Sequence, residues 1–345
     1  MVPSKTAAAK SPSAAKSIAH SNPNLTRIFT RIMNNGKGVL FALMTAAVSG
    51  VAVFVNSYAV QGSDVFSFIT IRNSAVALLL VGALLLTGQL EKLGRLSKRN
   101  WIQLAFVGLI GGALPFLLFF QGLSIVDGGA RASFLYRALF IIAAMLASLW
   151  LRERLSKRIL LGVGIAMLGN AMLLGEGWSN GWGAGEILVL SATVLWASEY
   201  VISKKVMNEE MLPPRILALG RMGFGAMMLL AFTAFTGQLW SVGAYSALEF
   251  QWVLISAAFL FSFVSFWYIG LANTSVVNAT SALVLGGPIT ALLTLAFAGK
   301  VLEPIAAMGL FLMAVGAAVV IGYSNIYGCW SVIRENLSGG GLWKV

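Results

Sequence analysis

The sequence predicts an all-α integral membrane protein with about ten transmembrane helices, arranged as two inverted five-helix repeats. Two observations carry this prediction. First, 58% of the 345 residues are hydrophobic and only 10% are charged, with a mean hydropathy of +0.85. A soluble core could not absorb such a composition. Second, landmarks in the first half of the chain recur in the second half at a nearly constant offset.

The apolar residues fall into runs about as long as a bilayer is thick, without the strict alternation of barrel strands. These runs predict helices near 38–60, 65–87, 101–123, 128–151, 158–175, 184–204, 214–236, 250–272, 277–299 and 304–323.

The duplication rests on two pairs of landmarks. Arg72 and Arg221 each precede a Thr-Gly-Gln-Leu tetrapeptide by fifteen residues and lie 149 positions apart. The segment 119–123 matches 267–271 at an offset of 148. Five spans are an odd number, so the second copy inserts upside down relative to the first.

The repeats are expected at 37–175 and 184–323, joined by an outer linker at 176–183. Residues 1–36 contain no acidic residue and no apolar run, which predicts a disordered basic cytoplasmic tail. An organellar transit segment is the alternative for that tail. Residues 324–345 are expected to be a second cytoplasmic tail.

The net charge of +12 is explained by the topology of the protein in a membrane rather than by nucleic-acid binding. With a cytoplasmic N-terminus and ten spans, 19 of the 24 Lys and Arg residues lie on the inner side. This positive-inside bias predicts a multi-pass protein of the cell (inner) membrane with both termini in the cytoplasm. It gives no reason to expect a nucleic-acid partner; the lipid bilayer is the expected one.

Enzymatic chemistry has little support in the sequence. A single cysteine, Cys329, and a single histidine, His20, cannot form a Cys/His zinc site or a His-based triad. No Gly-x4-Gly-Lys-Ser/Thr loop is present, so ATP is not expected to drive this chain. Neither a cofactor nor a metal is predicted.

Charged residues inside the spans mark the candidate site, because an unpaired charge is costly at the bilayer centre. Glu199 lies in the sixth span and Arg137 near the middle of the fourth. Arg72 and Arg221 are related by the repeat, which favours a shared structural role, such as pairing with a carbonyl, over substrate contact. With the neighbouring aromatic and amide side chains, the candidate substrate-binding residues are Arg137, Tyr136, Glu199, Trp196, Tyr200, Gln121, Trp267, Tyr268, Asn278 and Asn56.

Two hypotheses attach to the charges. Arg137 is expected to face a water-filled cavity and to favour an anionic substrate. Burial disfavours the ionised form of a carboxyl, so Glu199 is a candidate proton- or cation-sensing group. The alternative for Glu199 is a structural ion pair with Arg137, Arg72 or Arg221.

Helix breakers and small residues predict the packing. Pro115 and the segment 286–288 (Gly-Gly-Pro) interrupt helices, which is typical of a cavity lining or of a packing-adapted kink. Small residues at i, i+4 spacing recur in the third, fifth and tenth spans. They indicate close packing within the chain, or a homodimer face on spans 5 and 10.

With these landmarks in order, the chain resembles the drug/metabolite transporter (DMT) superfamily, specifically its EamA-like branch, over essentially 38–323. The resemblance rests on Arg72, residues 120–123 and 152–155, Trp196, Arg221, residues 268–271, Pro288 and Glu303. It implies a central cavity lined by spans 1, 3, 4, 6, 8 and 9, and export or exchange of small metabolites. The family usually has a proline in the fourth span, where this chain has Phe140.

The expected function is therefore secondary transport of a small polar metabolite by alternating access, by an exporter or exchanger. The alternatives are an integral-membrane enzyme, for which no nucleophile, base or metal cluster was found, and a membrane scaffold or receptor.

Overall fold

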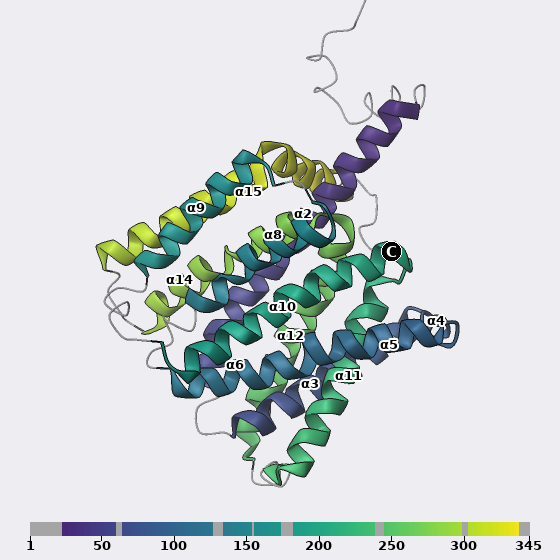
Figure 1. Ribbon diagram of the computed structural model, residues 1–345, viewed down its shortest axis with the longest axis vertical. Coiled ribbons are helices and arrows are strands. Elements are labelled where there is room, and N and C mark those ends of the chain that lie inside the picture. The colour runs from purple at the N-terminus through teal and green to yellow at the C-terminus, as the bar shows by residue number, and fades with distance from the viewer. Residues whose placement is uncertain are drawn as a thin grey trace, which may run out of the picture.

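A computed structural model of the chain describes residues 23–59, 64–126, 134–153, 155–173, 182–238, 245–298 and 303–337. Within these ranges the regular structure is entirely helical, as predicted (Figure 1). The helices of the first half are α2 (Pro23–Ala59), α3 (Val65–Leu86), α4 (Glu91–Gly94), α5 (Lys98–Val107), the π-helix η1 (Gly108–Ala113), α6 (Leu114–Ile125), α8 (Leu139–Trp150) and α9 (Lys157–Met172). Those of the second half are α10 (Ala184–Glu209), α11 (Pro214–Phe235), α12 (Ala247–Asn273), α13 (Val276–Leu283), α14 (Gly286–Ala298) and α15 (Pro304–Leu337).

Each of the ten predicted runs overlaps one or more of these helices, but not all form one long helix. Seven helical segments in the described residues are long and apolar enough to cross a membrane. The fourth and ninth spans contain shorter apolar helices, Phe134–Trp150 and Val276–Thr290, and α9 has 16 residues. The predicted spans therefore consist of long helices interleaved with shorter ones.

Polar side chains fix where several helices begin. Asp64 caps α3 by accepting from the Ser67 amide at 2.9 Å. Ser97 and Ser246 form capping boxes at α5 and α12, and Ser275 caps α13. Such caps satisfy amide groups that the first turn of a helix leaves without a partner.

The two predicted helix breaks lie close to where the structure departs from the α-helix. The third span passes through η1 immediately before Pro115, and the Leu114 amide bonds to the Leu109 carbonyl, five residues back. In the ninth span, α13 ends at Leu283 and α14 begins at Gly286, two residues before Pro288. A further bend occurs in α15 at Gly322, whose φ of 70° suits glycine.

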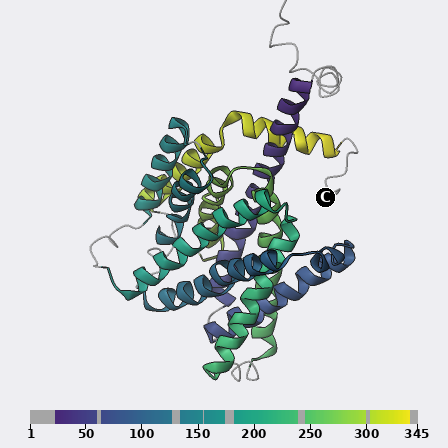
Figure 2. The ribbon, with the colours of Figure 1, turned by 45° about the vertical axis from the view of Figure 1, so that its right-hand side comes forward.

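Helices of the two halves pack against each other in pairs: α2 with α12, α6 with α10, and α3 with α11. Figures 1 and 2 show α9 and α15 side by side along one flank. There the small-residue stripe is used inside the chain, because Gly162 and Gly169 lie against the backbone of Gly316 and Gly309. The stripe thus serves intramolecular packing, and it does not present the dimer face considered for spans 5 and 10.

The tails differ in part from expectation. Helix α2 already begins at Pro23, so a disordered tail does not describe residues 23–36, and residues 1–22 lie outside the described residues. Helix α15 runs on to Leu337, through the first part of the predicted C-terminal tail. Most of the linker 176–183 also lies outside the described residues.

Candidate functional site: a buried ion pair and its aromatic wall

Three helices of the second half meet at the carboxylate of Glu199, which is fully buried on α10. Its Oε2 lies 3.3 Å from Nη1 of Arg221, on α11. Its Oε1 accepts a hydrogen bond from the Tyr268 hydroxyl of α12 at 2.6 Å and another from Ser203 one turn along α10. The structure therefore realises the alternative considered for Glu199, an ion pair with Arg221.

The first half contributes backbone to the same place, through η1. The Gly111 carbonyl accepts from Nε1 of Trp196 at 3.1 Å and from Nε of Arg221 at 3.2 Å. Gly111 also lies against the Glu199 side chain, where a Cβ atom would collide with it. A π-helical turn at a functional site is a recurrent arrangement. Here it brings a glycine backbone against the ion pair.

The two charges compensate each other within the protein, although the 3.3 Å contact between Oε2 and Nη1 lacks hydrogen-bond geometry. Arg221 is 2% exposed and Glu199 0%, so each charge has lost its water and depends on the other. Removing one partner of a buried pair costs about 3–5 kcal/mol, because the remaining charge is left uncompensated.

Aromatic rings surround the pair. Tyr200 and Trp267 lie with centroids 4.2 Å apart, and Trp196 contacts Phe116, Phe119 and Tyr136. Nε1 of Trp267 is buried, and no hydrogen-bond partner for it exists in the described part of the chain. An unsatisfied donor costs free energy in a closed core, so this indole is suited to a water or ligand acceptor.

The structure thus brings together six of the predicted site residues around one centre: Glu199, Trp196, Tyr200, Trp267, Tyr268 and Tyr136. Arg221, assigned only a structural role from the sequence, belongs to that centre.

Arg137 lies beside the centre rather than in it. Its Nη1 is 3.3 Å from Oδ1 of Asn170 and 3.2 Å from Sδ of Met313. The guanidinium also packs on Gly287, at the start of α14. Among the described residues, no carboxylate forms a salt bridge with Arg137. Its charge is therefore held by neutral acceptors alone.

Within the described residues, the remaining three predicted site residues form no hydrogen bond with the centre. Gln121 is exposed on α6. Oδ1 of Asn56 accepts from Ser256 at 2.6 Å, which joins α2 to α12. Asn278 lies in the first turn of α13, where its amide is capped by Ser275. The last two have local structural roles.

The two repeat-related arginines have different surroundings. Nε and Nη2 of Arg72 donate to Oδ1 of Asn73 at 3.2 Å each, and its guanidinium lies over the rings of Phe68, Phe116 and Phe120. Phe120 corresponds to Tyr268 and lacks the hydroxyl. The prediction of one shared structural role is thus too simple, because the second half adds a carboxylate.

Helix packing shows where the missing carboxylate would be. Gly122 packs on Gly185 as Gly270 packs on Gly38, which aligns α10 with α2 at an offset of 147. At this offset Glu199 corresponds to Ala52. The first half therefore has no acid at the position equivalent to Glu199, and Arg72 forms no salt bridge within the described residues.

Two polar contacts near the predicted inner ends of the spans were missed from the sequence. The Glu153 carboxylate accepts from the amides of Val276 and Val277 at 2.9 and 3.2 Å, and so caps α13 across the two halves. Nζ of Lys204 donates to the carbonyls of Leu271 and Ala272 at the end of α12, at 2.7 and 3.1 Å. Glu153 was part of the family resemblance, but its partner in the other repeat could not be read from local sequence.

In the described part of the chain, no group of three or more His, Cys, Asp and Glu side chains is arranged to hold a metal ion. The centre is an ion pair in an aromatic shell.

A family model described as "EamA-like transporter family" matches the chain twice, at residues 36–175 and 183–322. The chain belongs to the EamA-like transporter family. It is a multi-pass membrane protein, and the two matches confirm the duplication. No curated protein matches it. A solved structure described as "Crystal structure of protein" is similar in fold, with a TM-score of 0.66 at 16% identity, over 82% of this chain and 97% of that one.

Proposed function

We propose that this EamA-like protein is a secondary transporter that exports or exchanges a small polar metabolite by alternating access. The observation that carries the proposal is the buried Glu199–Arg221 pair, joined by Tyr268 and by the Gly111 carbonyl. Four helical segments from both repeats converge there, so relative motion of the repeats would change the surroundings of one site.

Tyr200 and Trp267 are buried in this structure, so opening of the site would have to expose the aromatic wall to the substrate. Tyr200 and Trp267 offer ring faces, and the unsatisfied Trp267 indole offers one hydrogen-bond donor. We propose that the substrate contacts these rings, and that Glu199 and Arg221 hold the aromatic side chains in position.

Arg137 provides a neighbouring cationic contact. Within the described residues its acceptors are neutral, and a carboxylate or other anionic group on the substrate would supply a countercharge. Gly287 leaves room for the guanidinium, because a Cβ atom at this position would collide with it. The substrate class we propose is therefore a small anion with a polar or ring-bearing body.

The test is uptake into inverted membrane vesicles, measured with pools of labelled carboxylates, neutral amino acids and amines. Arg137→Gln should reduce uptake of the anionic class without lowering the amount of protein in the membrane. Arg137→Lys, which keeps the charge, should retain part of it. Unchanged anion uptake by Arg137→Leu would remove Arg137 from the site.

A ligand-stabilisation screen of purified protein separates transport from the rival classes. A substrate that binds the folded state must raise apparent stability by mass action. A membrane enzyme would instead convert one of the ligands, and a scaffold would respond to none.

A further inference from the structure

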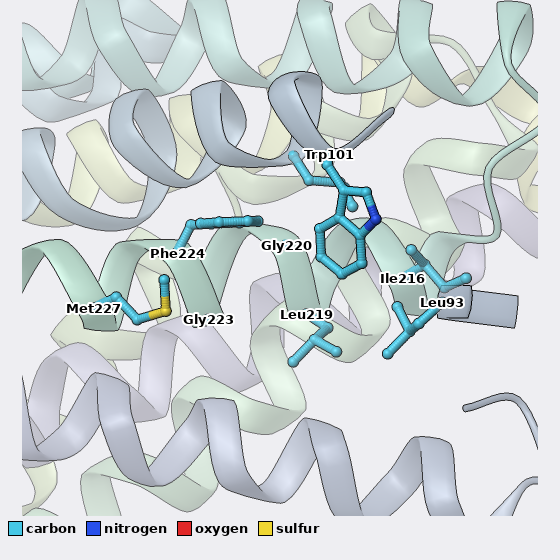
Figure 3. A pocket seen from close by; sticks show the side chains of 9 residues that line it. Leu93, Trp101, Ile216, Leu219, Gly220, Gly223, Phe224 and Met227 are labelled. Atoms are coloured by element: carbon cyan, nitrogen blue, oxygen red, sulfur yellow. The ribbon is translucent and has the colours of Figure 1, made fainter. Parts of the chain in front are cut away.

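An apolar groove runs along the outside of the bundle, away from the ion pair, between the α4–α5 segment and α11 (Figure 3). It has a volume of about 270 Å³. Its lining consists of Leu93, Trp101, Leu104, Ile216, Leu219, Gly220, Gly223, Phe224 and Met227. None of these side chains is charged, so the groove suits a hydrocarbon chain.

The groove's floor is open because of one glycine. A Cβ atom on Gly223 would touch only the tip of Leu219, at an ordinary contact distance. Gly220, one turn earlier, is instead filled by Leu104. The space over Gly223 is therefore not required for helix packing.

Basic residues lie at one end of the groove, on each of the two helices, α5 and α11, that form its sides. Lys98 precedes the lining residue Trp101 by one helical turn, and Arg215 precedes Leu219 by one turn, so each shares a face with the groove. No salt bridge to Lys98 or Arg215 exists among the described residues, whereas the neighbouring Arg99 pairs with Glu210 at 3.3 Å. Lys92 and Arg95 add exposed positive charge on and beside α4.

We propose that this groove binds an acidic phospholipid, with one acyl chain along α11 and the phosphate between Lys98 and Arg215. Both features match one molecule: an uncharged channel at membrane depth, and cations at the end where the positive-inside rule places the inner headgroups. Trp101, 41% exposed beside Lys98, is the kind of residue that lies at a headgroup boundary.

A lipid in this groove would affect the Glu199–Arg221 pair, because the helices that form the groove also carry parts of the pair's surroundings. Helix α5 leads directly into η1, and α11 carries Arg221. Gly108 and Gly112 pack against Gly220 and Gly225 of α11, so a lipid lying across α5 and α11 would hold this crossing together.

The experiment measures lipid retention by the purified full-length chain, using native mass spectrometry with phosphatidylglycerol and phosphatidylcholine of the same acyl length. We expect selective retention of phosphatidylglycerol. Gly223→Leu should abolish the bound lipid by filling the groove. Lys98→Gln/Arg215→Gln should weaken retention of phosphatidylglycerol about thirtyfold and remove the selectivity, because each basic residue near an anionic headgroup adds about fivefold in affinity.

Matched controls distinguish a site from general attraction to lipid. Gly164 is another helical glycine with open space around it, so Gly164→Leu adds the same bulk elsewhere. Lys157→Gln/Lys205→Gln removes two other exposed basic residues. The controls should retain lipid as the native chain does. Equal retention by Gly223→Leu, or equal loss in both charge pairs, would overturn the site.

Discussion

At the residue scale, the sequence located Glu199 and its depth but could not choose its partner. Three arginines of the predicted spans, Arg72, Arg137 and Arg221, were candidate partners. The choice of Arg221 depends on the rotation of α11 about its axis, which the Gly112–Gly225 contact fixes. That contact joins residues more than a hundred positions apart, so no local pattern reveals it.

Neutralising one member of the pair should destabilise the protein more than neutralising both. Glu199→Gln leaves Arg221 buried without a countercharge, at a cost of about 3–5 kcal/mol. Adding Arg221→Gln should restore part of that loss. Thermal unfolding in detergent of Glu199→Gln, Arg221→Gln and the double variant, compared with the native chain, provides the double-mutant cycle.

The same variants examine the proton-sensing hypothesis for Glu199. If Glu199→Gln is fully stable and its transport no longer depends on pH, the carboxyl couples protons and the structural assignment is wrong. A destabilised variant that keeps the native pH profile supports the structural pair.

Arg72 should tolerate neutralisation better than Arg221. Its partners are an amide and three aromatic rings, so Arg72→Gln leaves no buried carboxylate behind. We expect a loss of about 1–2 kcal/mol from the cation–π and hydrogen-bonding contacts. Unfolding midpoints of Arg72→Gln and Arg221→Gln, compared side by side, check this; equal losses would contradict the asymmetry.

At the element scale, hydropathy predicted where helices lie but not where they break. Residues 277–299 read as one apolar run, yet the structure divides them at Gly286. A window average responds to composition, whereas the break depends on the backbone hydrogen bond that Pro288 cannot donate.

Removing that cap should loosen the start of α13 specifically. Glu153→Ala deletes the acceptor for two amides, a change worth about 1 kcal/mol at a helix N-terminus. Hydrogen exchange at Val276 and Val277 should accelerate. Exchange at the end of α12, which Lys204 caps, serves as the internal control, and acceleration at both places would indicate general unfolding.

The crossing of η1 and α11 should not accept a methyl group. A Cβ atom on Gly112 would collide with the Arg221 carbonyl and with the Gly225 backbone, neither of which can rotate away. Gly112→Ala should therefore fail to give folded protein, as judged by size-exclusion chromatography. Gly164→Ala, in open space, should behave as the native chain does.

At the scale of the whole molecule, duplication and helical class followed from the sequence because they depend on composition and self-similarity. The central site followed only in part. Aromatic residues beside Glu199 indicated Trp196 and Tyr200, but the inward orientation of η1 and the outward position of Gln121 depend on how the halves pack.

Orientation in the membrane remains a prediction with a direct measurement. After Cys329→Ser, a cysteine placed in 176–183 should react with an impermeant reagent added outside, and one in 92–99 should not. The 19 basic residues on the inner side are the physical reason. Labelling in the reverse sense would reject both cytoplasmic termini and the inner-leaflet position of the lipid groove.

The π-helix η1 also marks a difference in length between the two repeats. The offset between the halves falls from 149 at Arg72 and Arg221 to 148 at Phe120 and Tyr268, so the first half has one residue more between these landmarks. Between them the first half contains η1, whereas its counterpart α12 is continuous α-helix. A five-residue bond in place of a four-residue one is how a helix absorbs one added residue. The two copies thus differ by one residue along this helix, and the π-turn that accommodates it brings the Gly111 carbonyl to Arg221, so the two halves are not equivalent at the ion pair.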